Sequence, residues 1–166
     1  HTVMQHIPLD KRWDKESISN FLTELVATEK WTAEEVDYID TKAIEYFFQT
    51  EIGQLLKESK VERELPFSYT IPAASLYDDW DEQLDEKVLI QGVIDCIIYT
   101  DDGIVLLDYK TDQINDNLVD EAVIEQLKNR YKVQMKLYKT ALENILKTDI
   151  QASYLYFFSK KLTLEM

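Results

Sequence analysis

The segment VLIQGVIDCIIYTDDGIVLLDYK, residues 88–110, decides the fold of this chain. Two runs rich in Val, Ile and Leu, at 88–99 and 104–109, flank the polar sequence TDDG at 100–103. Asp and Gly next to each other between two such runs are a strong signal for a tight β-hairpin turn. The segment therefore predicts two antiparallel strands.

Three charged residues stand among these apolar strands. Asp95 ends the apolar stretch that includes Val93 and Ile94, and Asp108 and Lys110 close the second run. Charges at such positions are costly unless they are paired or bound to a metal. Asp108 and Lys110 are two residues apart and therefore point to the same face of their strand.

The position of the turn decides which residue lies opposite Asp95. A turn at residues 102–103 places Asp95 opposite Lys110, and a turn at residues 101–102 places it opposite Asp108. Either register brings two carboxylates and one ammonium group to one side of the hairpin, within cross-strand reach. A three-residue loop without a bulge would separate them.

Two converging carboxylates form an oxygen-rich site that suits Mg²⁺ or Mn²⁺. A lysine beside them can offset charge in a phosphoryl transition state. The same spacing also occurs in carboxylate–lysine ion pairs on exposed sheet faces, so these residues alone leave a structural interpretation open.

The residues before the hairpin predict a helical layer followed by an edge strand. Apolar side chains recur at helical spacing up to about residue 60. Thr32 and Glu35 form a capping-box sequence for a helix expected to continue through Phe47. Residues 61–71 are strand-like, and Pro66 places them at a sheet edge or a bulge.

After the acidic stretch 75–86, expected to be a surface loop, and the hairpin, a long helix at 118–146 and a buried strand at 152–158 are predicted. This order predicts an α+β (mixed α/β) fold with a central mixed sheet flanked by helices. We expect one domain over residues 1–166, with a helical layer at 1–60 and a sheet core with the long helix at 61–166.

Composition narrows the class of protein. The 166 residues are 45% hydrophobic, enough for a real core, and no apolar run of 18 residues or signal peptide is present. A single cysteine, Cys96, excludes an internal disulfide and fits the cytoplasm. The 32 acidic and 18 basic residues give a net charge of −14, which argues against a free-standing DNA binder unless cations or other protein segments supply positive charge.

Five short motifs carry a further indication. They are HTVMQ at 1–5, ELPF at 64–67, GVID at 92–95, LLDYKT at 106–111, and Tyr131, Gln134 and Tyr138 on the long helix. In this order they resemble the RecB-type branch of the PD-(D/E)XK nucleases, and most of all the C-terminal nuclease domain of AddA-type subunits of bacterial AddAB helicase–nucleases. The resemblance extends over nearly the whole chain and implies a restriction-endonuclease-like PD-(D/E)XK core.

The resemblance implies a metal site formed by His1, Asp95, Asp108 and the backbone carbonyl of Tyr109, with Lys110 as the catalytic lysine. The implied ion is Mg²⁺, with Mn²⁺ as an alternative. His6 competes with His1 for the histidine position but fits the motif less well. The single cysteine leaves no ligands for the iron–sulfur cluster of other branches.

The long helix is expected to complete the site. Gln134 and Tyr138 lie one helical turn apart with Tyr131 on the same stripe. The resemblance implies that Gln134 and Tyr138 touch substrate or order Lys110, whereas half-buried packing is the alternative. Glu64 is expected to be an outer metal ligand or a structural residue.

Three lysines of this helix, Lys132, Lys136 and Lys139, recur at helical spacing. They are candidates for weak contacts to a DNA backbone, or else belong to a solvated face.

The function implied is metal-assisted hydrolysis of DNA phosphodiesters during double-strand-break processing and recombinational repair, in the bacterial cytoplasm with the nucleoid. The chain would be a fragment of a larger subunit, next to helicase domains of the same chain and an AddB-like second subunit that help to guide the DNA. It has no Walker motif and is therefore not expected to be the motor itself. The alternatives are an inactive nuclease-fold scaffold or DNA-guiding module, a stand-alone single-strand exonuclease, and an acidic protein-binding module.

Overall fold

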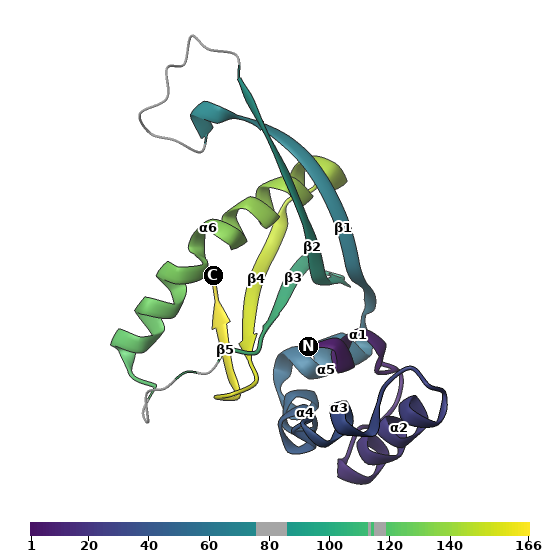
Figure 1. Cartoon of the computed structure of the whole chain (residues 1–166). Coiled ribbons are helices and arrows are strands. Elements are labelled where there is room, and N and C mark those ends of the chain that lie inside the picture. Colours follow the sequence, from purple (N-terminus) through teal and green to yellow (C-terminus); the bar gives the residue numbers. More distant parts are fainter. Residues whose placement is uncertain (76–85, 113, 115–118) are drawn as a thin grey trace.

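The computed structural model describes residues 1–75, 86–112, 114 and 119–166. A layer of short helices precedes the sheet, and one long helix, α6 (Glu121–Leu146), lies between its third and fourth strands in the sequence (Figure 1). The helices of the first layer are α1 (Thr2–His6), α2 (Lys15–Ala27), α3 (Ala33–Asp37), α4 (Thr41–Gln49) and α5 (Glu51–Glu58). The one-turn 3-10 helix η1 (Ala73–Ser75) follows the first strand.

The described strands form one mixed sheet in the order β1-β2-β3-β4-β5. Among these described strands only β3 and β4 run parallel; the other neighbouring pairs are antiparallel. The strands are β1 (Lys60–Pro72), β2 (Lys87–Thr100), β3 (Gly103–Lys110), β4 (Ile150–Phe157) and β5 (Leu162–Glu165). The α+β class, the mixed sheet and the edge position expected for the Pro66 strand are confirmed.

The sheet separates two hydrophobic cores. Val105 and Leu107 of β3 belong to the core shared with α1, α2, α4 and α5, whereas Leu106 between them belongs to the core under α6. Alternate residues of a strand point to opposite faces, so β3 is buried on both sides. A strand buried on both sides is selected as a continuous apolar run, which explains the run at 104–107.

The two long strands of the β1–β2 hairpin exchange faces partway along their length. Cys96 and Ile98 of β2 pack against the helical layer, but Ile94, two residues before Cys96, packs in the core under α6. The change falls at Asp95. On β1 it falls at Glu64, which lies inside the strand with a positive φ of 55°. The hairpin therefore joins both cores, and the change of face occurs at two carboxylates.

The helical layer differs from the expectation in one respect. The capping box between Thr32 and Glu35 is present, but the helix it starts, α3, ends at Asp37. A second helix, α4, begins after Asp40, whose side chain accepts a hydrogen bond from the backbone N–H of Ala43. The single helix expected to run through Phe47 is wrong because a second capping residue interrupts it.

Two other expected boundaries concern the residues around the sheet. The long helix begins at Glu121 and not at 118, because Asp120 caps it by accepting from the N–H of Val123. Residues 76–85, most of the expected acidic loop, and residues 115–118 lie outside the described part of the chain. At 26 residues α6 is the longest described helix, and no helix in that part is long and apolar enough to cross a membrane.

Phe47 connects the helical layer to the sheet. Its side chain is fully buried, and its ring lies 4.7 Å from the ring of Tyr156 on β4 and 5.6 Å from the ring of Tyr109 on β3. Edge-to-face aromatic pairs at such distances add to the energy of burial.

We therefore expect Phe47→Ala to lower the free energy of unfolding by about 3–5 kcal/mol, measured by urea denaturation. Tyr38→Ala is the matched control, because Tyr38 is 90% exposed and its loss should change stability by less than about 0.5 kcal/mol. Equal midpoints for the two variants would contradict the packing described here.

Candidate active site

The turn of the β2–β3 hairpin fixes the register of the carboxylates. Thr100 pairs with Gly103, so residues 101–102 form the turn. Continued along the strands, this register sets Asp95 opposite Asp108, which was one of the two expected arrangements. The β2–β3 pairing ends at Cys96 and Leu107, one residue before the two aspartates. The strands thus separate at the point where the carboxylates stand.

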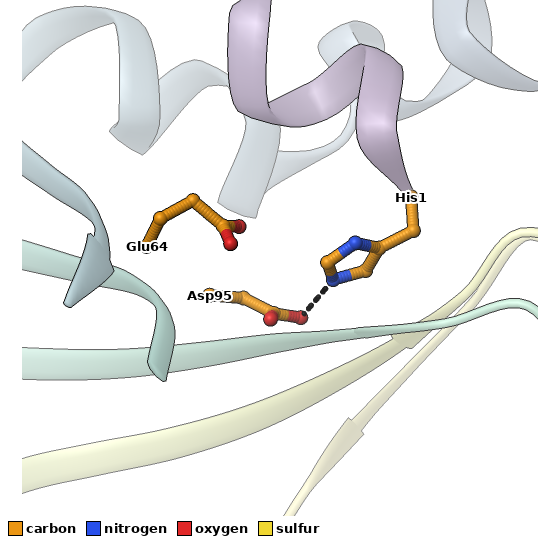
Figure 2. A group of neighbouring side chains, drawn as sticks. All are labelled: His1, Glu64 and Asp95. Carbon is orange, nitrogen blue, oxygen red and sulfur yellow. Dashed lines mark ion pairs between the residues drawn. The ribbon is translucent and has the colours of Figure 1, made fainter. Parts of the chain in front are cut away.

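A third carboxylate lies at the same level of the sheet. On β1, Arg63 pairs with Cys96 and Leu65 with Ile94, so Glu64 between them stands opposite Asp95. Ligand atoms of His1, Glu64 and Asp95 lie within 4.8 Å of one another (Figure 2). The adjacent strands β1, β2 and β3 therefore place Glu64, Asp95 and Asp108 in one row across the sheet.

His1 reaches this row from the helical layer. Its Nε2 lies 2.9 Å from Oδ2 of Asp95, and its Nδ1 lies 3.2 Å from the side-chain amide nitrogen of Gln5, one turn further along α1 (Figure 2). The amide can only donate, so Nδ1 accepts and Nε2 carries the proton toward Asp95. The competing His6 is exposed at the far end of α1 and is not part of the cluster formed by the described residues.

Arg63 holds α1 in this position. Its guanidinium Nη1 donates to the carbonyl oxygens of Met4 at 2.9 Å and Ile7 at 2.7 Å. A helix of five residues is not stable by itself, and its last carbonyls lack partners within the helix. Arg63 supplies partners for these carbonyls and ties the helix that carries His1 to β1.

Asp95 is buried and receives two donors on one oxygen. Besides His1, the backbone N–H of Tyr109 donates to Oδ2 of Asp95 at 2.7 Å. Asp95 is only 8% exposed, so these contacts replace water that burial has removed. Tyr109 therefore meets the cluster through its N–H, and the role expected of its carbonyl oxygen stays a prediction.

Asp108 is more deeply buried and pairs with Lys110. Nζ of Lys110 lies 2.6 Å from Oδ2 of Asp108, and this oxygen has no directed hydrogen bond within the described residues. Burial raises the pKa of Asp108, the charge of Asp95 adds to the rise, and the ion pair with Lys110 opposes it. Asp108 is thus a carboxylate whose negative charge is only partly compensated.

The α6 helix fixes Lys110 from the other side. Nζ of Lys110 donates to Oε1 of Gln134 at 2.9 Å, and the Gln134 amide nitrogen donates to the hydroxyl of Tyr138 at 3.1 Å. Nζ also lies 4.4 Å from the centre of the Tyr131 ring, an attractive cation–π distance. The hydroxyl of Tyr131 donates to Asp112 at 2.7 Å.

The structure therefore brings together most of the residues expected in the site. The exceptions are the three lysines of α6, since none of them belongs to the cluster that the described residues form. Lys139 lies 4.0 Å from Glu143, whereas Lys132 and Lys136 line a groove between α6 and β1.

Three supporting residues were not expected from the sequence: Gln5, Arg63 and Asp112. Arg63 and Asp112 act through contacts to residues of other elements, whereas Gln5 lies one helical turn from His1. Only this spacing of four residues was visible in the sequence, and it became informative once residues 2–6 were known to be helical.

The donor set suits a divalent cation. The cluster offers one imidazole nitrogen and several carboxylate oxygens, and Oδ2 of Asp108 lacks a directed hydrogen bond within the described residues. Carboxylate oxygens are preferred by Mg²⁺ and Mn²⁺, and an imidazole is compatible with transition metals. In this structure the proton on Nε2 of His1 occupies the direction a cation would take, so binding a cation there would expel it.

Comparison with known proteins agrees with this geometry. The chain is 44% identical over 167 residues to the AddA subunit of the ATP-dependent helicase/nuclease of Oceanobacillus iheyensis, covering 100% of this chain and 13% of that protein. It is 45% identical to the protein of the same name from Bacillus licheniformis, covering 95% of this chain and 13% of that protein. The corresponding Clostridium botulinum protein is 41% identical, with 96% of this chain and 12% of that protein covered.

The chain thus spans about 13% of the length of the curated relatives that it matches. The family model described as the PD-(D/E)XK nuclease superfamily matches residues 1–165, almost the whole sequence. Since the match includes the hairpin, the row of carboxylates and the lysine held by α6, this chain belongs to the PD-(D/E)XK nuclease superfamily.

Proposed function

We propose that this nuclease domain hydrolyses phosphodiester bonds of DNA with the help of a divalent cation, Mg²⁺ or Mn²⁺. The observation that carries the proposal is the row of Glu64, Asp95 and Asp108 next to His1 and Lys110. A buried cluster of this composition is costly without a positively charged ligand. A catalytically inactive scaffold would have no need of it, so this alternative is not favoured.

Asp95, Asp108, His1 and Glu64 would hold the cation, which when bound polarises the phosphate and stabilises its charge. Among the described residues, Lys110 supplies the ammonium group of the site. Its Nζ, held between Asp108 and Gln134, is positioned to stabilise negative charge on the phosphate oxygens or to restrain the attacking water. Gln134 and Tyr138 fix the direction of the lysine and extend toward the substrate.

Glu64 supports the proposal through its backbone. A non-glycine residue with positive φ costs about 1–2 kcal/mol, and Glu64 adopts this conformation inside a strand. Strained residues of this kind persist where the surrounding structure requires them. Here the strain turns the Glu64 carboxylate toward Asp95 and His1, which favours a ligand role over a purely structural one.

We further propose that the chain works as one nuclease domain inside a longer, AddA-type subunit that contains helicase domains and pairs with an AddB-like subunit. The names and lengths of the relatives support this proposal. The helicase would deliver DNA strands to the site during double-strand-break repair in the cytoplasm. A motor that feeds the strand forward would also reduce the need for a strongly basic surface on this chain.

The first prediction concerns cation binding. Asp108→Ala is expected to weaken Mn²⁺ binding, measured by titration calorimetry, by at least about 10-fold, since even outer partners of metal ligands cost that much. Asp101→Asn is the control, because it removes one carboxylate from the exposed turn of the same hairpin. Equal affinity in wild type and Asp108→Ala would exclude the proposed site.

The second prediction separates stability from function at Glu64. Glu64→Gly should lower cation affinity but leave the metal-free protein as stable as the wild type or up to about 1 kcal/mol more stable, because glycine tolerates positive φ. Lys147→Gly is the control, since Lys147 has a φ of 56° outside the site and should gain stability without losing cation affinity. A large loss of stability in Glu64→Gly would assign Glu64 a structural role.

The third prediction concerns Lys110. Lys110→Ala should slow cleavage of a single-stranded oligonucleotide by about 10²–10³-fold, the usual loss for one such electrostatic group. Cation affinity should be retained, which calorimetry would show. Gln134→Ala should give a smaller loss, since it removes only the group that orients the lysine. A Lys110→Ala variant within a few-fold of the wild-type rate would show that the lysine is dispensable.

A further inference from the structure

A groove runs between α6 and the end of β1, beside the proposed active site. It has a volume of about 540 Å³ and is lined on one side by Tyr69, Ile71 and Pro72 of β1. Val133 and Leu137 of α6 complete an apolar floor, and Val133 is 64% exposed. A groove of this volume, with an apolar floor and few charged groups, has the usual character of a ligand site.

The charges of the groove are opposite to those of the chain. Among its described lining residues only Lys132 and Lys136 are charged, although the chain as a whole has a net charge of −14. Within the described ranges neither lysine lies in an ion pair, whereas Lys139, one turn beyond, lies 4.0 Å from Glu143. The groove is therefore complementary to an anionic ligand that also has apolar surface.

The groove is continuous with the proposed active site. Tyr138, which accepts a hydrogen bond from Gln134, has its ring 5.3 Å from the ring of Phe67 on β1. Tyr69 follows Phe67 by two residues and so lies on the same face of β1, and both belong to the core under α6. From Gln134 to Thr140 at the far part of the groove is about 9 Å along the helix axis.

We propose that this groove binds a segment of single-stranded DNA next to the phosphate that is cleaved. Lys132 and Lys136 contact backbone phosphates, and unstacked bases lie on the apolar floor with Tyr69. Positive side chains that follow the backbone, combined with aromatic or apolar surfaces for the bases, are the general means of holding single strands. A duplex keeps its bases stacked inside and cannot use such a floor. This inference rests on the proposed nuclease function and specifies its substrate.

The test is the salt dependence of binding, measured by fluorescence anisotropy with a labelled oligothymidylate in Ca²⁺. The groove variant is Lys132→Gln with Lys136→Gln, and the control is Lys139→Gln with Lys147→Gln. Both double variants lose two positive charges from α6 or its C-terminal cap, and glutamine preserves helix propensity. Any difference between them therefore reports the position of the charge and not the net charge.

The groove variant should bind oligothymidylate on the order of 10- to 30-fold more weakly at 0.1 M salt, and its log–log salt slope should be smaller in magnitude by about 1.4, since each lost contact to a single strand contributes about 0.7. The control should match the wild type. For a blunt duplex of equal length, the slopes of wild type and groove variant should agree. An equal loss on duplex would overturn the assignment to single strands.

Failure of this inference is distinguishable from failure of the proposed function. If wild type cleaves oligothymidylate and the groove variant binds it as tightly as wild type does, the nuclease function stands and the groove does not bind DNA. In that case the groove belongs to another anionic ligand, such as an acidic peptide. If wild type does not cleave, the proposed function itself is wrong.

Discussion

The burial of two neighbouring carboxylates, Asp95 and Asp108, within an apolar sheet is the constraint on which the rest of this structure depends. An ionised group removed from water needs partners that replace its hydration. Asp95 finds them in His1 and in the backbone N–H of Tyr109, and Asp108 finds Lys110. The compensation is incomplete, because burial and the charge of Asp95 still raise the pKa of Asp108. The remaining negative potential is what draws a divalent cation to the site.

This constraint explains why helices cover both faces of the sheet. The helical layer contributes His1, and Arg63 holds the short helix that carries it. The α6 helix contributes Gln134 and the Tyr131 ring, which hold the ammonium group of Lys110. The site lies where the two hydrophobic cores meet, at the level where the β1–β2 hairpin changes face. Each layer thus stabilises the sheet and positions one part of the chemistry.

A net charge of −14 does not prevent a protein from acting on a polyanion. Electrostatic interactions between exposed groups are screened beyond about 8 Å at physiological salt, so a ligand responds to the charges near its own path. Along α6 that path meets Lys132 and Lys136 in a groove whose described lining includes no acidic residue. At the site itself the cation supplies the positive charge. Acidic residues elsewhere then have little influence on the bound strand, although they do oppose its approach.

The sequence by itself determined the hairpin, the order of the elements and the identity of Asp95, Asp108 and Lys110, because period-two burial and turn chemistry are local properties. It left two hairpin registers open and predicted one helix where a second cap at Asp40 makes two. Only the tertiary structure decided which register forms, that Glu64 joins the cluster through a positive φ, and which lysines of α6 lie outside ion pairs in the described part of the chain. These outcomes depend on contacts between segments distant in the chain, which local patterns do not encode.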